Sequence, residues 1–257
     1  MQQKPPPSAP LAGQRVIVTR PRAQADRLAA RLAELGAEVI EHPVIRISEP
    51  PDWAPVDQAL ARLEQYDWLV FSSANGVRYL VDRLLNQAGG LECLDRIKLA
   101  AIGPGTADEL ARYGLRAALV PGQYRAEALA EALAQTAPRG RFLLARASRG
   151  REALHQQLAA AGASVDQVVV YTSSDLTEPD PIVARDLAAG RIDWVTVTSS
   201  AIARNLVRLF GPDLLKARLA TISPLTSAAL KELGYEPAVE AELYTVDGLI
   251  EAMVAAV

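Results

Sequence analysis

An internal repeat runs through most of this chain. Residues 15–85 are echoed by residues 141–211 at a constant offset of 126, and beyond residue 100 the offset falls to 120. Matched pairs include Arg20 with Arg146, Trp68 with Trp194, Ser73 with Ser199, Thr106 with Thr226 and Gly114 with Gly234. Self-similarity over so long a period indicates two copies of one module rather than a solenoid. We therefore expect two similar lobes with a cleft between them.

Each copy contains three strand-to-helix units. In the first copy, short apolar runs at residues 16–19, 68–71 and 99–102 are each followed by a polar turn and an amphipathic helix. Continuous apolar runs are typical of parallel strands that are buried on both faces. Alternating strands and helices predict a parallel sheet with right-handed crossovers. The sequence therefore predicts α/β lobes with flavodoxin-like, doubly wound sheets.

Proline-rich breaks fall at nearly equivalent places in both copies. They are Glu49-Pro-Pro51 and Glu178-Pro-Asp-Pro181, and each follows an expected strand. Crossings between lobes at these two breaks would give one lobe from the middle of the chain and another from both ends. Periodicity alone does not separate this swapped arrangement from two lobes in tandem.

Composition excludes several classes of protein. The net charge of −3 gives no basic footprint for nucleic acid, and the single cysteine, Cys93, excludes a disulfide framework. Apolar runs are too short to span a membrane. Residues 1–13 are rich in proline and lack the apolar core of a secretory signal. We therefore expect a disordered tail over 1–13, no membrane contact and a cytoplasmic location.

The chemistry is expected at the carboxyl ends of the strands, where open α/β sheets bind ligands. The turns there carry small hydroxyls, glycine or arginine, and each opens a helix, an arrangement suited to anions. The candidate binding residues are Arg20, Ser73, Asn75, Gly103, Thr106, Arg146, Arg151, Ser199, Ser200, Ser223 and Thr226. Each serine or threonine alone is better explained as a helix N-cap. Six such turns facing one crevice favour a polyanionic ligand.

Several missing motifs exclude other chemistries. No G-x-G-x-x-G follows the first strand, and no G-x-x-x-x-G-K-[ST] is present. No Asp or Glu ends a strand, so a pair of catalytic carboxylates is not expected. The two histidines, His42 and His155, have no metal-ligand spacing around them. We therefore expect no nucleotide, no cofactor and no metal.

Tyr171 closes the apolar run Val168–Tyr171 at the second presumed crossing. Its repeat partner is Ile45, so the shared architecture does not require a phenol at this place. A tyrosine here would face the expected cleft. The alternative is an amphipathic tyrosine with its hydroxyl at the surface, and position alone favours that alternative slightly.

Several motifs together resemble the uroporphyrinogen-III synthase family over the whole chain after the tail. They are Val18–Pro21, Phe71–Gly76, Ala101–Thr106, Val170-Tyr171, Val197–Ser200 and Ile222–Thr226. Two departures are present, since Ser223 stands where the family often has glycine, and Asn75 occupies a turn position that varies in the family.

The resemblance implies the swapped arrangement, with two flavodoxin-like doubly wound parallel-sheet lobes joined by a two-stranded linker. One lobe would comprise residues 14–44 and 176–257, the other residues 50–167, with linkers at 45–49 and 168–175.

The resemblance also implies a cofactor-independent enzyme of tetrapyrrole (haem, chlorophyll or cobalamin) biosynthesis. Its substrate would be hydroxymethylbilane, a linear polycarboxylate tetrapyrrole that closes with loss of water and inversion of ring D. Tyr171 matches the family tyrosine proposed as the acid, and Thr106 and Thr226 match threonines that line the family's cleft. A monomer in transient contact with hydroxymethylbilane synthase is expected. The rivals are a two-lobed binding protein without turnover and a nucleotide-dependent enzyme.

Overall fold

The computed structural model describes residues 9–87, 90–150 and 152–257 of the chain. It contains two compact units. Unit 1 comprises Met1–Arg46 with Ser174–Val257, and unit 2 is the continuous segment Ile47–Ser173. The predicted segments, 14–44 with 176–257 and 50–167, fall inside these two units.

Unit 1 is built on a five-stranded sheet of order β10-β9-β8-β1-β2, in which all neighbouring strands are parallel. Its strands are β1 (Arg15–Val18), β2 (Glu38–Glu41), β8 (Trp194–Val197), β9 (Arg218–Thr221) and β10 (Val239–Glu240). Counted along the chain, the order is 2-1-3-4-5, which is the flavodoxin-like arrangement.

Unit 2 has a sheet of order β3-β7-β6-β4-β5, whose last four strands are parallel. Its strands are β3 (Ile45–Ser48), β4 (Trp68–Phe71), β5 (Lys98–Ala101), β6 (Arg141–Ala147) and β7 (Ser164–Asp175). An isolated parallel bridge from Ala100 to Leu119 marks the place that β10 occupies in unit 1. The prediction of doubly wound parallel sheets is confirmed, and β3 lies beside β7 where the chain passes between the units.

Each sheet combines strands from both copies of the repeat. By the repeat offsets, β6, β7, β4 and β5 of unit 2 are equivalent to β1, β2, β8 and β9 of unit 1. The first copy thus supplies β1 and β2 to unit 1 but β4 and β5 to unit 2. Apolar side chains on these strands hold the exchanged pieces together within each unit.

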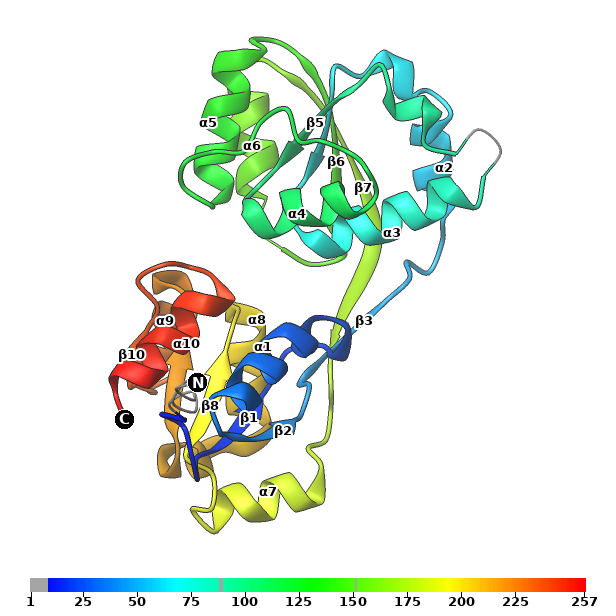
Figure 1. Cartoon of the computed structure of the whole chain (residues 1–257). Helices are drawn as coiled ribbons and strands as arrows, with labels where there is room; N and C mark the ends of the chain where they lie inside the picture. The colour runs from blue at the N-terminus through cyan, green and yellow to red at the C-terminus, as the bar shows by residue number, and fades with distance from the viewer. Residues whose placement is uncertain (1–8, 88–89, 151) are drawn as a thin grey trace, which may run out of the picture. The chain divides into compact units, whose positions relative to one another are not determined.

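Helices cover both faces of the unit 2 sheet (Figure 1). Because side chains alternate along a strand, Leu69 and Phe71 pack on one face and Trp68 and Val70 on the other. The first face is covered by α2 (Ala54–Leu60), α3 (Ala74–Leu85) and α4 (Pro104–Arg112), together with the short 3₁₀ helices η1 (Leu63–Gln65) and η2 (Glu92–Leu94). The second face is covered by α5 (Ala126–Thr136) and α6 (Ala153–Ala160).

In unit 1, α1 (Arg22–Glu34) and α10 (Val246–Ala255) share a core with β1 and β8. Leu28 and Leu249 pack there with Val16, Val18 and Trp194, all of them fully buried. The remaining helices of unit 1 are α7 (Pro181–Ala188), α8 (Ser200–Phe210), η3 (Gly211–Lys216) and α9 (Pro224–Lys231).

The N-terminal segment differs from the sequence prediction. Residues 10–13 form a turn on unit 1, where Leu11 is 0% exposed and belongs to the core beside α1. The Leu11 N–H donates to the Leu35 carbonyl at 3.0 Å. The expected disordered tail over 1–13 is therefore wrong for residues 9–13, because a leucine in this segment reaches the core. Residues 1–8 lie outside the described part of the chain.

Candidate functional site

Tyr171 lies in unit 2, on β7 opposite Ala147 of β6, just after a register shift between the two strands. Its side chain belongs to the core cluster shared with α3 and α4, and the residue is 8% exposed. The phenol is not left without a partner there, because its Oη lies 3.0 Å from the Ser73 Oγ. The alternative of a surface tyrosine is therefore not what the structure shows.

Ser73 connects this phenol to the start of α3. It is the N-cap of the helix, and its Oγ accepts the Gly76 N–H at 3.1 Å. The interpretation of Ser73 as a cap is confirmed, yet the same hydroxyl also contacts Tyr171. Asn75, in the first turn of α3, is 6% exposed, and its amide lowers the pKa of the Tyr171 phenol.

Tyr79 is a member of this group that the sequence analysis did not single out. Its ring stacks on that of Tyr171, with centroids 5.8 Å apart and planes inclined by 19°. The signal that could have found it is the four-residue spacing from Asn75, since residues four apart share one face of a helix.

Opposing influences act on the acidity of the Tyr171 phenol. Burial raises its pKa above the ordinary value near 10, because the phenolate loses solvation. The Ser73 hydroxyl and the Asn75 amide act the other way and favour the phenolate. The phenol is therefore protonated at neutral pH and has partners that stabilise the anion left after proton transfer.

Thr106 and Thr226, which match threonines of the family, lie at equivalent helix N-termini but have different neighbours. Thr226 on α9 is 2% exposed, and its Oγ1 lies 3.1 Å from the Oγ of Ser223. Thr106 on α4 is also buried, but its equivalent neighbour is Gly103, which has no hydroxyl. A Cβ at Gly103 would lie 3.1 Å from the Tyr124 Cβ, so glycine at this position leaves room for that tyrosine.

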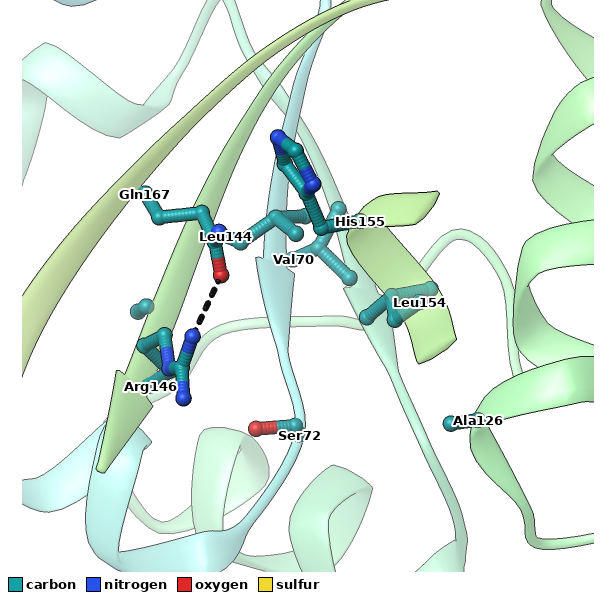
Figure 2. Close-up of a pocket in the computed structure, with 9 residues that line it drawn as sticks. Val70, Ser72, Ala126, Leu144, Arg146, Leu154, His155 and Gln167 are labelled. Atoms are coloured by element: carbon teal, nitrogen blue, oxygen red, sulfur yellow. Dashed lines mark hydrogen bonds between the residues drawn. The ribbon is translucent and has the colours of Figure 1, made fainter. Parts of the chain in front are cut away.

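Arg146 lines an open pocket in unit 2 (Figure 2). Its Nη1 donates to Gln167 Oε1 at 2.9 Å and also to the carboxylate of Glu152. This guanidinium lowers the pKa of Glu152. Leu154 and His155 of α6 and Ala126 of α5 complete this side of the pocket. Figure 2 shows Arg146 directed toward Gln167. Arg146 therefore already has an anionic partner.

The pocket and the tyrosine cluster lie on opposite faces of the unit 2 sheet. Val70 and Leu144 line the pocket and belong to the core under α5 and α6, whereas Tyr171 belongs to the core under α3 and α4. The expectation that all the polar turns face one crevice therefore needs correction within this unit. The reason is the alternation of side chains along each strand.

Arg20, the repeat equivalent of Arg146, follows β1 in unit 1. The Arg20 Nη2 donates to Gln24 Oε1 at 3.5 Å, and no carboxylate pairs with Arg20 among the described residues. Burial lowers the pKa of the Arg20 guanidinium, which nevertheless stays charged at neutral pH. Arg20 is thus a partly buried cation suited to an anionic ligand.

The other candidates in unit 1 lie at helix starts. Ser199 caps α8 and accepts the Ile202 N–H at 3.2 Å, so the cap interpretation is confirmed for it. The Ser200 hydroxyl donates to the Leu225 carbonyl at 3.3 Å and links the turns after β8 and β9. Ser223 begins α9 without capping it through its side chain. Arg151, also predicted to bind substrate, lies outside the described residues.

Among the described residues, no cluster of three or more His, Cys, Asp or Glu side chains could hold a metal ion. No helix there is both long enough and apolar enough to cross a membrane.

Comparison with known proteins gives one consistent family. Residues 26–251 match the model of uroporphyrinogen-III synthase HemD. The chain is 34% identical over 255 residues to a uroporphyrinogen-III synthase of Synechococcus elongatus, covering 95% of this chain and 96% of that protein.

Solved structures show the same fold. A uroporphyrinogen III synthase from Thermus thermophilus aligns with a TM-score of 0.65 at 20% identity, covering 95% of this chain and 98% of that one. The corresponding enzyme of Helicobacter pylori gives a TM-score of 0.65 at 16% identity, with 94% and 98% covered. The chain, matched by the family model over most of its length, belongs to the uroporphyrinogen-III synthase family.

Proposed function

We propose that this protein is a uroporphyrinogen-III synthase, which closes hydroxymethylbilane to a macrocycle with inversion of ring D and release of water. The observation that carries the proposal is the buried Tyr171 phenol, hydrogen bonded to Ser73 at the carboxyl ends of the unit 2 strands. Family membership supports it, and the absence of a phenol at the repeat-equivalent Ile45 marks the group as specific to this site.

The chemistry begins with loss of the substrate hydroxyl. Tyr171 donates its proton to that oxygen, the C–O bond breaks, and water leaves with formation of a cationic azafulvene. The azafulvene is attacked by the substituted carbon of ring D, which gives a spiro intermediate that rearranges to the inverted ring. The proton released at the final step returns to the phenolate, so the enzyme is regenerated without a cofactor.

Most of the rate enhancement comes from holding the substrate in one orientation. The azafulvene is already reactive, and without guidance it closes to the symmetric type I isomer. Holding one folded geometry can contribute several orders of magnitude in rate. Arg20 carries charge without a carboxylate partner among the described residues, so it suits a substrate carboxylate. Thr106, Thr226, Gly103, Ser199, Ser200 and Ser223 supply hydroxyls and backbone N–H groups at helix starts.

A binding protein without turnover is the rival, and turnover separates the two. In a coupled assay, porphobilinogen and hydroxymethylbilane synthase generate the substrate, and the porphyrin isomers are separated after oxidation. Added protein should shift the product from type I to type III without metal or nucleotide. An unchanged isomer ratio with folded protein would refute the proposed function.

The proposal extends to the location of the protein, its oligomeric state and the enzyme that supplies its substrate. A cytoplasmic monomer that meets hydroxymethylbilane synthase transiently would receive the unstable substrate soon after its release. Products of this reaction would feed haem, chlorophyll or cobalamin synthesis.

A further inference from the structure

The internal repeat provides a comparison for the surroundings of Tyr171. Ser73 and Ser199 are equivalent and identical, and both cap the helix that follows. Three of the positions that differ at the repeat offset lie in the tyrosine cluster. Tyr171 corresponds to Ile45, Asn75 to Ala201, and Tyr79 to Asn205. Three differences that meet in one cluster point to a shared purpose.

The unit 1 counterparts show what the fold alone requires. There Ser199 accepts the Ile202 N–H at 3.2 Å. Asn205, in place of Tyr79, donates to the Leu176 carbonyl at 3.1 Å. Capping and helix packing are therefore achieved in unit 1 without Asn75, Tyr79 or a phenol.

The hydrogen bonds around Tyr171 leave the phenolic proton available for transfer. Ser73 Oγ already accepts the Gly76 N–H, and its own proton can be donated to the phenolic oxygen 3.0 Å away. A side-chain amide such as that of Asn75 offers two further N–H donors. A phenolic oxygen accepts two hydrogen bonds and still keeps its own proton for donation. Tyr79 holds the ring itself by stacking.

We infer that Asn75, Ser73 and Tyr79 are positioning residues that act through Tyr171 and direct its proton toward the substrate. The inference rests on the proposed function and differs from the expectation that Ser73 and Asn75 bind substrate. A substrate-binding residue would contribute whether or not the phenol is present. A positioning residue contributes only while the phenol is there to be positioned.

A double-mutant cycle separates these two roles. Rates of type III formation are measured for the full chain, Asn75→Ala, Tyr171→Phe and the double variant. Asn75→Ala should lower kcat about tenfold with KM unchanged, the effect of losing one polar group that acts on the phenol. In the Tyr171→Phe background, the same change should have less than about a twofold effect. The fold accepts alanine here, since Ala201 occupies the equivalent place on α8.

Two controls make the result specific. Thr226→Ala, in unit 1, should lower activity by the same factor in both backgrounds. Tyr79→Asn, which copies Asn205, removes the ring that stacks on Tyr171 and should lower kcat. Thermal unfolding of each variant verifies that it is folded, and Asn75→Leu replaces Asn75→Ala if the latter does not fold.

The outcomes distinguish the inference from the function on which it rests. Equal losses from Asn75→Ala with and without Tyr171, or a rise in KM alone, would overturn the positioning role and leave the enzyme activity standing. No type III product from the unmodified chain would refute the proposed function itself. Non-additive losses in kcat support the inference.

Discussion

Val16 on β1 lies opposite Trp194 on β8 in the parallel register of the unit 1 sheet. The equivalent pair in unit 2 is Phe142 with Trp68. In unit 2 the second copy of the repeat supplies Phe142 and the first copy supplies Trp68. Each central strand pair therefore joins one copy of the repeat to the other. A unit is complete only when pieces of both copies are present.

This exchange predicts which fragments fold. The segment 47–173 contains β4, β5, β6 and most of β7, with both cores that cover their sheet, so it should unfold cooperatively when expressed alone. The segment 14–140 contains one whole copy of the repeat but separates β1 from β8 and β4 from β6. It should give no cooperative transition by circular dichroism. A stable 14–140 fragment would contradict the exchanged arrangement.

Leu11 should stabilise the protein although it lies in a segment whose composition suggests disorder. It is fully buried against α1, and replacing a buried leucine by alanine typically costs about 2–5 kcal/mol. Leu11→Ala should therefore lower the free energy of unfolding by about that much in urea denaturation. Leu243→Ala is the control, because Leu243 is exposed and its loss should change little. Equal stability of the two variants would show that residues 9–13 pack only loosely.

Arg20 and Arg146 should differ in function despite their equivalence. A substrate carboxylate can pair with Arg20 directly, and a charge-assisted hydrogen bond is worth about 1.5–3 kcal/mol. Arg20→Gln should therefore raise KM roughly tenfold or more. Arg146 already pairs with Glu152 and Gln167, so Arg146→Gln should raise KM less. The steady-state rates of type III formation test this order, and a larger effect at Arg146 would place the carboxylate site at the pocket of unit 2.

Much of this fold follows from the sequence because it is repeated. The offset predicts equivalent strands, and buried apolar runs such as Trp68–Phe71 indicate parallel strands. The face on which a turn residue lies was harder to predict, because a shift of one residue moves a side chain across the sheet. For that reason the sequence predicts one crevice for Ser73 and Arg146, whereas Ser73 contacts Tyr171 and Arg146 lines the pocket on the other face of the sheet. The sequence does not single out Tyr79, because a tyrosine at this position is ordinary for an amphipathic helix.

Acid should destabilise the protein through His42. Burial lowers the pKa of this imidazole, although the charge of Asp180 acts in the opposite direction. Its ring packs edge-on against Phe210 with centroids 5.6 Å apart, and Nε2 has no hydrogen-bond partner in the described residues. The unfolded chain therefore binds more protons than the folded one once the pH falls through the unfolded pKa of 6.5. The free energy of unfolding should decrease as the pH falls from 6.5 to the pKa that His42 has in the folded protein, by at most about 1.4 kcal/mol per pH unit.

Denaturation at pH 7 and pH 5 measures this loss. His42→Gln cannot be protonated and should reduce the difference between the two pH values. His155→Gln, which changes the other histidine, should leave the difference in place. If both variants lose stability in acid as the unmodified chain does, the sensitivity arises from other groups.

Tyr171→Phe should separate catalysis from folding. The change removes one hydroxyl and its contact with Ser73, and a single hydrogen bond contributes only about 1 kcal/mol to stability. A general acid at a leaving group is typically worth about 10²–10⁴-fold in rate. The variant should therefore melt close to the unmodified chain yet form type III product that much more slowly. Residual activity is expected, because the azafulvene also forms spontaneously and the binding groups still orient it.

Tyr113→Phe is the matched control for that variant. Tyr113 is also a partly buried tyrosine of unit 2, at the end of α4, and its hydroxyl donates to Asp82 at 2.9 Å. Burial, together with that carboxylate, raises its pKa to about 12. Since the phenol lies at the opposite end of α4 from Thr106, its loss should leave the type III rate unchanged. If Tyr171→Phe is fully active while Thr106→Ala is not, the Tyr171 phenol serves only packing, and the chemistry belongs to the helix starts.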